Sequence, residues 1–189
     1  VWEPADIKTI ALTGTDQNDT LFGTYQDDVL EGFAGNDRLY SIVGGNDLLD
    51  GGDGNDWLTA YYGNNVLVGG AGDDHLFSGD GNDVLDGGKG NDSITSSGGN
   101  DIFLYGLGDG RDTLNLEFSK IGDLDVLRFR ADIKPEDVVI NRLKSGTDLR
   151  IEFTNSPGDS INISNFFVST YSNDISKPLT IEFDNGVIW

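Results

Sequence analysis

The amino-acid sequence predicts an all-β fold in which short parallel strands stack in coils and a β-rich region follows. Three observations support it: an acidic, glycine-rich segment, a nine-residue repeat within that segment, and strand-like apolar runs after it. The chain has 189 residues, which suits one domain or two small ones. We divide it into an N-terminal flank (1–13), a repeat region (14–104) and a C-terminal β-rich capping region (105–189).

Charge and glycine are concentrated in the repeat region. Residues 14–104 hold 17 acidic and 2 basic residues, a net charge of −15, and 20 of the 27 glycines. The whole chain has a formal net charge of −21, so it repels phosphate and is not expected to bind nucleic acid. It has no Cys, which excludes disulfides and thiolate chemistry, and no apolar run of the roughly 18 residues that a transmembrane helix needs. Because the chain starts at Val1 and lacks Met, we interpret it as a piece of a longer polypeptide.

The repeat region consists of ten nine-residue units, with one extra residue, Ser41, before the fourth. Position 4 is Gly in eight units, position 5 is always Asn or Asp, and position 6 is Asp in nine. The aspartates at position 6 are Asp19, Asp28, Asp37, Asp47, Asp56, Asp74, Asp83, Asp92 and Asp101. Position 8 is always apolar: Leu21, Leu30, Leu39, Leu49, Leu58, Leu67, Leu76, Leu85, Ile94 and Phe103. This pattern predicts one inward-facing apolar side chain per unit.

The period also predicts how the units are arranged in space. Three residues around position 8 form a short strand, and the other six reverse the chain, with Gly supplying positive φ angles. Two units complete one coil, so like strands stack about 4.8 Å apart and the turns of alternate units lie above one another. Stacked turns bring carboxylates and backbone carbonyls together, and such oxygen-rich sites suit Ca²⁺.

The charge of the repeat region predicts several bound ions. Two rows of five turns leave four gaps each, so up to about eight Ca²⁺ could bind between them, enough to balance the charge of −15. Without ions, one aliphatic side chain per nine residues cannot offset chain entropy and charge repulsion. We therefore expect calcium binding and folding to be one event.

The two rows of turns differ in sequence. The odd units supply a complete row of aspartates, whereas the even units have Asn65 in place of an aspartate. The Ser41 insertion is expected to offset the turns of Asp28 and Asp47. We predict four good sites in the row of odd units and fewer in the other.

The units GGDGNDWLT (51–59) and GGAGDDHLF (69–77) resemble the G-G-x-G-x-D-x-U-x nonapeptide of RTX (repeat-in-toxin) proteins. The resemblance implies a right-handed parallel β-roll that binds Ca²⁺ in its turns. It also implies a secreted bacterial protein that is exported by type I secretion machinery, disordered inside the cell and folded by calcium outside. YGLGDGRDTL (105–114) resembles the segment that closes such arrays. The segments 125–129, 133–142, 147–153, 159–167 and 179–189 resemble the tail of haemolysin-type calcium-binding proteins, which caps the last coil.

Other interpretations of the acidic residues are weaker. A disordered acidic linker would not need an apolar residue in every unit, and no twelve-residue loop ends in the Glu of an EF-hand. The lone His75 lies at an outward position without a nucleophile or base partner, so we expect no catalytic residue and no enzyme activity. Asp109 and Asp112 could bind a terminal ion or simply cap the roll.

The outward positions leave two possibilities open. Position 7 of the even units forms an aliphatic stripe, and aromatic residues recur outward in the odd units. Either the tail or the N-terminal flank covers these residues, or they form a docking face for a glycan, a cell surface or a protein. The stripe comprises Val29, Leu48, Val66, Val84 and Ile102, and the aromatics are Phe22, Tyr40, Trp57 and Phe77. The sequence thus favours a calcium-dependent folding and secretion module, with a binding module of a toxin or adhesin as the alternative.

Overall fold

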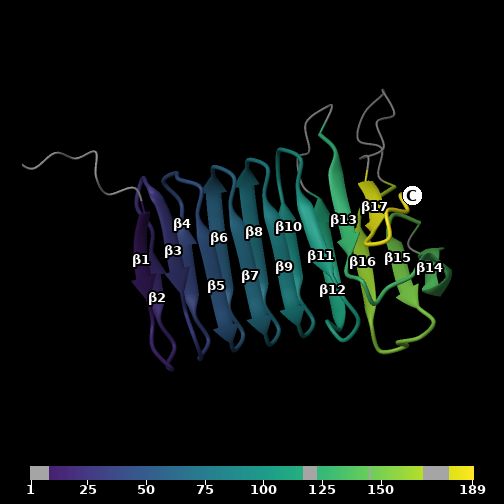
Figure 1. Ribbon diagram of the computed structural model, residues 1–189, viewed down its shortest axis with the longest axis horizontal. Helices are drawn as coiled ribbons and strands as arrows, with labels where there is room; N and C mark the ends of the chain where they lie inside the picture. Colours follow the sequence, from purple (N-terminus) through teal and green to yellow (C-terminus); the bar gives the residue numbers. More distant parts are fainter. Residues whose placement is uncertain (1–8, 117–122, 145, 168–178) are drawn as a thin grey trace, which may run out of the picture.

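The computed structural model describes residues 9–116, 123–144, 146–167 and 179–189. Its strands form two sheets that run along an elongated roll (Figure 1). From β1 to β13 successive strands alternate between the two sheets, so each pair of strands completes one coil. The predicted all-β fold with a parallel β-roll is therefore confirmed.

The first sheet has eight strands, all paired in parallel. In spatial order they are β1 (Thr9–Thr13), β3 (Asp27–Glu31), β5 (Leu48–Asp53), β7 (Val66–Ala71), β9 (Val84–Lys89), β11 (Ile102–Tyr105), β13 (Asp125–Phe129) and β17 (Leu179–Phe183). Equivalent residues of neighbouring coils are in register, as Val66 with Val84 shows.

The second sheet has nine strands and changes direction at its C-terminal end. It runs through β2 (Thr20–Phe22), β4 (Arg38–Ser41), β6 (Trp57–Tyr62), β8 (His75–Asp80), β10 (Ser93–Ser96), β12 (Arg111–Leu116), β16 (Ser160–Ser164), β15 (Leu149–Phe153) and β14 (Val138–Arg142). Pairing is parallel from β2 to β16 and antiparallel from β16 to β14. A short 3₁₀ helix, η2 (Pro135–Asp137), precedes β14.

One apolar side chain per repeat fills the narrow interior of the roll. Because side chains alternate across a strand, the position-8 residue faces inward while its neighbours face outward. Leu21, in the first unit, is partly buried and packs against this core. The position-8 residues that are fully buried are Leu30, Leu39, Leu49, Leu58, Leu67, Leu76, Leu85, Ile94 and Phe103.

The capping region extends the roll lengthwise. Its strands β12, β13, β16 and β17 join the ends of the two sheets, and an aromatic cluster of Tyr105, Phe129, Phe153 and Phe183 fills the last coils. Of the possibilities left open for the outer aliphatic stripe, the described strands of the tail do not provide its cover, because they extend the sheets lengthwise, and Val66 remains 37% exposed. The part of the N-terminal flank before Thr9 lies outside the described residues.

The extra residue before the fourth unit does not offset the turns, contrary to the expectation from sequence. The backbone N–H of Asp28 donates to Oδ1 of Asp47 at 2.8 Å, and Val29 pairs with Leu48 in the normal register. The turn absorbs the additional residue because Gly44 and Gly45 both adopt positive φ angles, of 121° and 112°. Stacking of the second set of turns is therefore intact.

Candidate metal centre

The position-6 residues are gathered into two rows of turns, one along each edge of the roll. The first row, at crossings from the first sheet to the second, contains Asp19, Asp37, Asp56, Asp74 and Asp92. The second row, at the reverse crossings, contains Asp28, Asp47, Asn65, Asp83 and Asp101. All of these side chains except that of Asp19 are almost completely buried. The structure thus brings together the residues that sequence reasoning proposed as metal ligands.

Within each row, one side-chain oxygen of every position-6 residue after the first coil is used for stacking. Oδ1 accepts a hydrogen bond from the backbone N–H of the equivalent residue one coil earlier. Asp37 N–H donates to Asp56 Oδ1, and Asp56 N–H donates to Asp74 Oδ1, both at 2.7 Å. The second row repeats the pattern, and Asn65 takes part through its amide oxygen at 3.0 Å. Asn can therefore replace Asp in this ladder.

Both ladders continue beyond the ten repeats. Asp92 N–H donates to Asp112 Oδ1 at 3.0 Å, and Asp101 N–H donates to Asp125 Oδ1 at 3.1 Å. Asp125 was not recognised from sequence, because a longer connection separates it from Asp101. The signal was present locally: Asp125 opens the tripeptide Asp-Val-Leu, as Asp28 and Asp83 do.

The Asn or Asp at position 5 has a structural role that sequence reasoning missed. Its side-chain oxygen accepts the backbone N–H of the position-5 residue one coil later. Asn55 N–H donates to Asn36 Oδ1 at 2.9 Å, and Asn64 N–H donates to Asn46 Oδ1 at 2.8 Å. The position-5 side chains thus form a second ladder of hydrogen bonds, opposite in direction to the ladder of position 6. Since Oδ1 of each position-6 aspartate is used in its own ladder, Oδ2 is the candidate metal ligand.

That second oxygen is unpaired in much of the first row. Among the described residues, Oδ2 of Asp37, Asp56, Asp74 and Asp92 is buried without a hydrogen-bond partner, as is Oδ2 of Asp83 in the second row. A buried carboxylate oxygen without a partner is costly, because burial removes its hydration and nothing replaces it. These oxygens need a cation or a proton.

Burial also makes these carboxyl groups reluctant to ionise. Desolvation raises the pKa of Asp56, Asp83 and Asp92 to about 6 and that of Asp74 to about 8, with added repulsion from neighbouring carboxylates. Asp112, which extends the first row, has its pKa raised to about 8 for the same reasons. Ionised carboxylates in these turns would lack hydration and repel one another, and a bound cation would relieve both effects.

Glycine at position 1 keeps the first-row turns open. A Cβ on Gly51 would lie 2.6 Å from the carbonyl oxygen of Gly69 and even closer to Asp56 Oδ2, and Gly32 and Gly69 have the same surroundings. Carboxylate and carbonyl oxygens thus face one small space, and this donor set fits Ca²⁺. Within the described ranges, no three carboxylate or imidazole side chains converge, so backbone carbonyls would have to complete any site.

At the C-terminal end of the roll, the guanidinium of Arg130 pairs with the carboxylate of Asp109. Asp109 accepts hydrogen bonds from the Gly106 N–H at 2.7 Å and from Arg130 Nη1 at 2.8 Å. Arg130 Nη2 also pairs with Asp86. Asp109 could either bind a terminal ion or cap the roll, and these contacts support the capping role.

Comparison with protein families agrees with this geometry. A family model described as RTX calcium-binding nonapeptide repeat matches residues 13–41, 43–76 and 77–114, which is more than half of the chain. The chain belongs to this RTX family. A second model, described as haemolysin-type calcium binding protein related domain, matches residues 148–189. The RTX match is interrupted beside Ser41, where the repeat has its extra residue.

The two family matches identify the chain as a haemolysin-type calcium-binding module with RTX repeats. RTX repeats and the β-roll are structural rather than enzymatic elements. No curated protein matches the chain. Over the described part of the chain, no helix has the length and apolar character needed to cross a membrane.

Proposed function

We propose that this chain is a calcium-dependent folding module of a secreted bacterial protein that supports its export by type I secretion machinery. The single observation that carries the proposal is the set of buried, unpartnered carboxylate oxygens in stacked turns. The module itself does no chemistry. His75 is exposed and lies against the Trp57 ring, with centroids 4.9 Å apart, and forms no part of a catalytic site.

The proposed switch follows from the balance between a thin core and a high charge. Each repeat has one large apolar side chain, at position 8, to bury in the core, whereas ordering its nine residues costs conformational entropy at every one of them. The net charge of −15 in residues 14–104 adds repulsion. In the bacterial cytosol, where free calcium is scarce, the chain stays unfolded and can be exported; at extracellular millimolar calcium the sites fill and the roll forms.

A calcium titration tests this proposal. The protein is treated with EDTA and followed by far-UV circular dichroism as Ca²⁺ is added, with Mg²⁺ as the matched control. We expect a cooperative gain of β signal with Ca²⁺ in the high micromolar to millimolar range and no comparable gain with Mg²⁺. A protein that is fully folded in EDTA and unaffected by Ca²⁺ would contradict the proposal.

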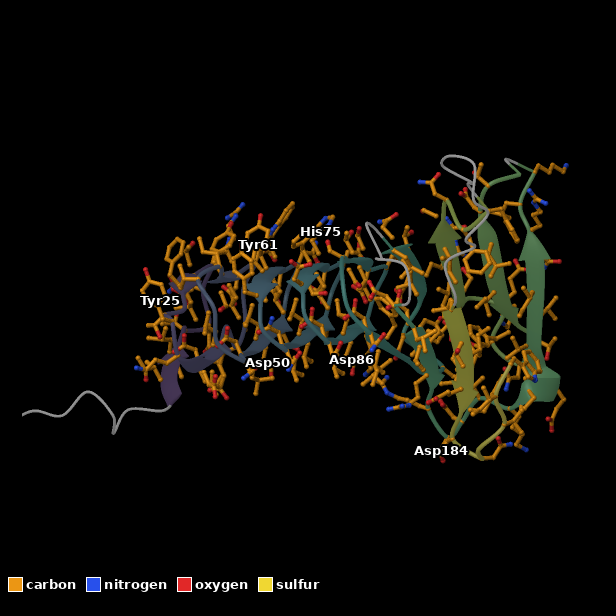
Figure 2. All side chains as sticks on the ribbon, turned by 90° about the horizontal axis from the view of Figure 1, so that it is seen from above. Tyr25, Asp50, Tyr61, His75, Asp86 and Asp184 are labelled. Atoms are coloured by element: carbon orange, nitrogen blue, oxygen red, sulfur yellow. The ribbon has the colours of Figure 1, made fainter. Side chains whose placement is uncertain are left out.

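The outer face of the second sheet favours a second candidate function, glycan binding. In Figure 2, Tyr61 and His75 lie on one side of the roll, and Asp50 and Asp86 lie on the opposite side. Beside the first row, a groove of about 400 Å³ combines exposed rings with amide and charged groups. Aromatic faces with adjacent hydrogen-bonding groups suit the apolar faces and hydroxyls of neutral sugars. The groove is lined by Asn18, Asn36, Asp37, Arg38, Asn55, Asp56, Trp57, Asp73 and His75.

Binding calorimetry with a neutral β-linked glucose oligomer tests this second candidate on the calcium-loaded protein. We expect measurable binding that Trp57→Ala reduces at least tenfold, because the exposed indole supplies the stacking surface. Val66→Ala, on the first sheet, is the control and should leave binding unchanged. Equal binding by the two variants would argue against a glycan site in this groove.

A further inference from the structure

We propose that calcium is confined to the first row of turns, with about four ions at Asp37, Asp56, Asp74 and Asp92, while the second row is closed by groups of the chain itself. This inference rests on the proposed function, since it concerns which turns take the ion. It departs from the expectation of up to about eight ions. Three features of the structure carry it: backbone conformation, the residue at position 1, and the partners of each position-6 side chain.

The backbone of the two rows differs at position 2. In the first row this residue is left-handed in four successive turns, with φ of 76° at Phe33, 96° at Gly52, 113° at Gly70 and 89° at Gly88. Phe33 is one of two described non-glycine residues with positive φ, a conformation that persists only where the surroundings impose it. The second-row counterparts Thr24, Tyr61, Gly79 and Ser97 are not left-handed.

Position 1 differs as well, and it decides what fills the turn. First-row turns have glycine there, and Oδ2 of the aspartate and a carbonyl oxygen of the next coil lie within about 2.6 Å of the place that a Cβ would occupy, as at Gly32, Gly51 and Gly69. The second row has glycine at this position only in its first turn, at Gly23; beyond it, the strand register aligns Ser41 with Ala60 and Ala60 with Ser78, so small side chains occupy the position. The equivalent residue of the tenth unit is Ser96, which is also completely buried.

The second-row hydroxyls hydrogen-bond the oxygens that an ion would need. Ser41 Oγ donates to Asp47 Oδ2, and Ser96 Oγ donates to Asp101 Oδ2. A buried carboxylate oxygen that already accepts a hydroxyl hydrogen bond has less need of a cation. Oδ2 of each of these two aspartates is therefore hydrogen-bonded by the serine that ends the preceding strand.

The middle of the second row is closed by different means. Asn65 carries no charge, and its amide nitrogen donates to the turn carbonyls of Gly63 at 3.1 Å and Tyr62 at 3.4 Å. The carbonyls that would face an ion are thus occupied by an amide. Asp83 differs from the other second-row aspartates, because its Oδ2 is buried without a hydrogen-bond partner, as is Ser78 Oγ. Ser78 precedes Asp83 as Ser96 precedes Asp101, and by this equivalence we assign the Ser78 hydroxyl to Asp83.

The first coil is closed in both rows by threonine. Thr15 Oγ1 donates to Asp19 Oδ2 at 2.7 Å, and Thr24 Oγ1 donates to Asp28 Oδ2 at 3.0 Å. The same hydroxyls accept the backbone N–H groups of Gln17 and Gln26, which replace the usual position-4 glycine. The N-terminal coil is therefore an ion-free end of the roll.

The number of bound ions tests the inference directly. Isothermal titration calorimetry and native mass spectrometry of the intact chain at saturating Ca²⁺ should give about four ions per molecule. About eight ions would overturn the inference and leave the proposed function standing. No calcium binding at all would overturn both, so the two failures are distinguishable.

A matched pair of variants locates the ions. Asp56→Asn and Asp47→Asn remove one charge each from equally buried positions, and Asn65 shows that the ladder hydrogen bond survives this change. Asp56→Asn should lower the ion count by at least one and raise the Ca²⁺ concentration for half-maximal folding about tenfold or more. Asp47→Asn should keep the ion count of the unmodified chain. A loss of ions in Asp47→Asn would overturn the inference, and if Asp56→Asn does not fold, the count on the unmodified chain decides.

Discussion

Without calcium, the folded roll is expected to become more stable as the pH falls from about 8 to about 5. The folded-state pKa is about 8 for Asp74 and about 6 for Asp56 and Asp92, whereas the ordinary value is 3.8. Between these values the folded state binds more protons than the unfolded state, so stability is present at low pH and is lost as the pH rises through the folded pKa. One pKa unit corresponds to about 1.4 kcal/mol, so the combined effect should reach several kcal/mol. The far-UV circular dichroism of EDTA-treated protein at a series of pH values measures this effect as a gain of β signal at low pH.

With calcium bound, the slope should be reversed. The ligand carboxylates are then ionised, and protons compete with Ca²⁺, so stability should fall as the pH is lowered from 7 to 5. Acidification also weakens repulsion across the whole acidic surface. A control at about 1 M salt screens that surface term while leaving the buried carboxylates largely unaffected. If both forms lose stability on acidification even in high salt, buried carboxyl groups do not govern folding of the calcium-free chain.

The second large effect is expected at the C-terminal aromatic cluster. Phe129 packs against three rings, with centroid distances of 6.3 Å to Tyr105, 5.5 Å to Phe153 and 5.2 Å to Phe183. Phe129→Ala should therefore lower the free energy of unfolding of the calcium-loaded protein by about 3–5 kcal/mol. Because folding and calcium binding are coupled, the Ca²⁺ concentration for half-maximal folding should rise in the same variant.

Ile140→Ala is the matched control for the cap. Ile140 lies on β14 and is 42% exposed, so its truncation should cost less than about 1 kcal/mol. Urea unfolding at saturating Ca²⁺ compares the two variants. If Phe129→Ala leaves the calcium dependence of the repeats unchanged, the last coils do not stabilise the roll and the capping interpretation fails.

The sequence by itself determined the repeat, the inward apolar residue of each unit and the gathering of the position-6 aspartates. These features depend on local rules: alternation of side chains across a strand, turn formation by glycine, and a constant period that stacks equivalent residues. Leu58 and Asp56, for example, could be assigned to the core and the turns from their positions in the unit alone, and both are buried there. The same rules predicted the strands of the capping region.

Only the tertiary structure decided which carboxylate oxygens remain free. The pairing of Ser96 with Asp101, the guanidinium of Arg130 on Asp109 and the extension of a ladder to Asp125 all join residues that the nine-residue pattern does not relate. The sequence also did not predict the direction in which the tail extends. Apolar runs indicate that strands form, but they do not indicate which edge of a sheet each strand joins. The physical reason is common to these cases: a hydrogen bond depends on distances of about 3 Å between groups that meet only when the coils have stacked.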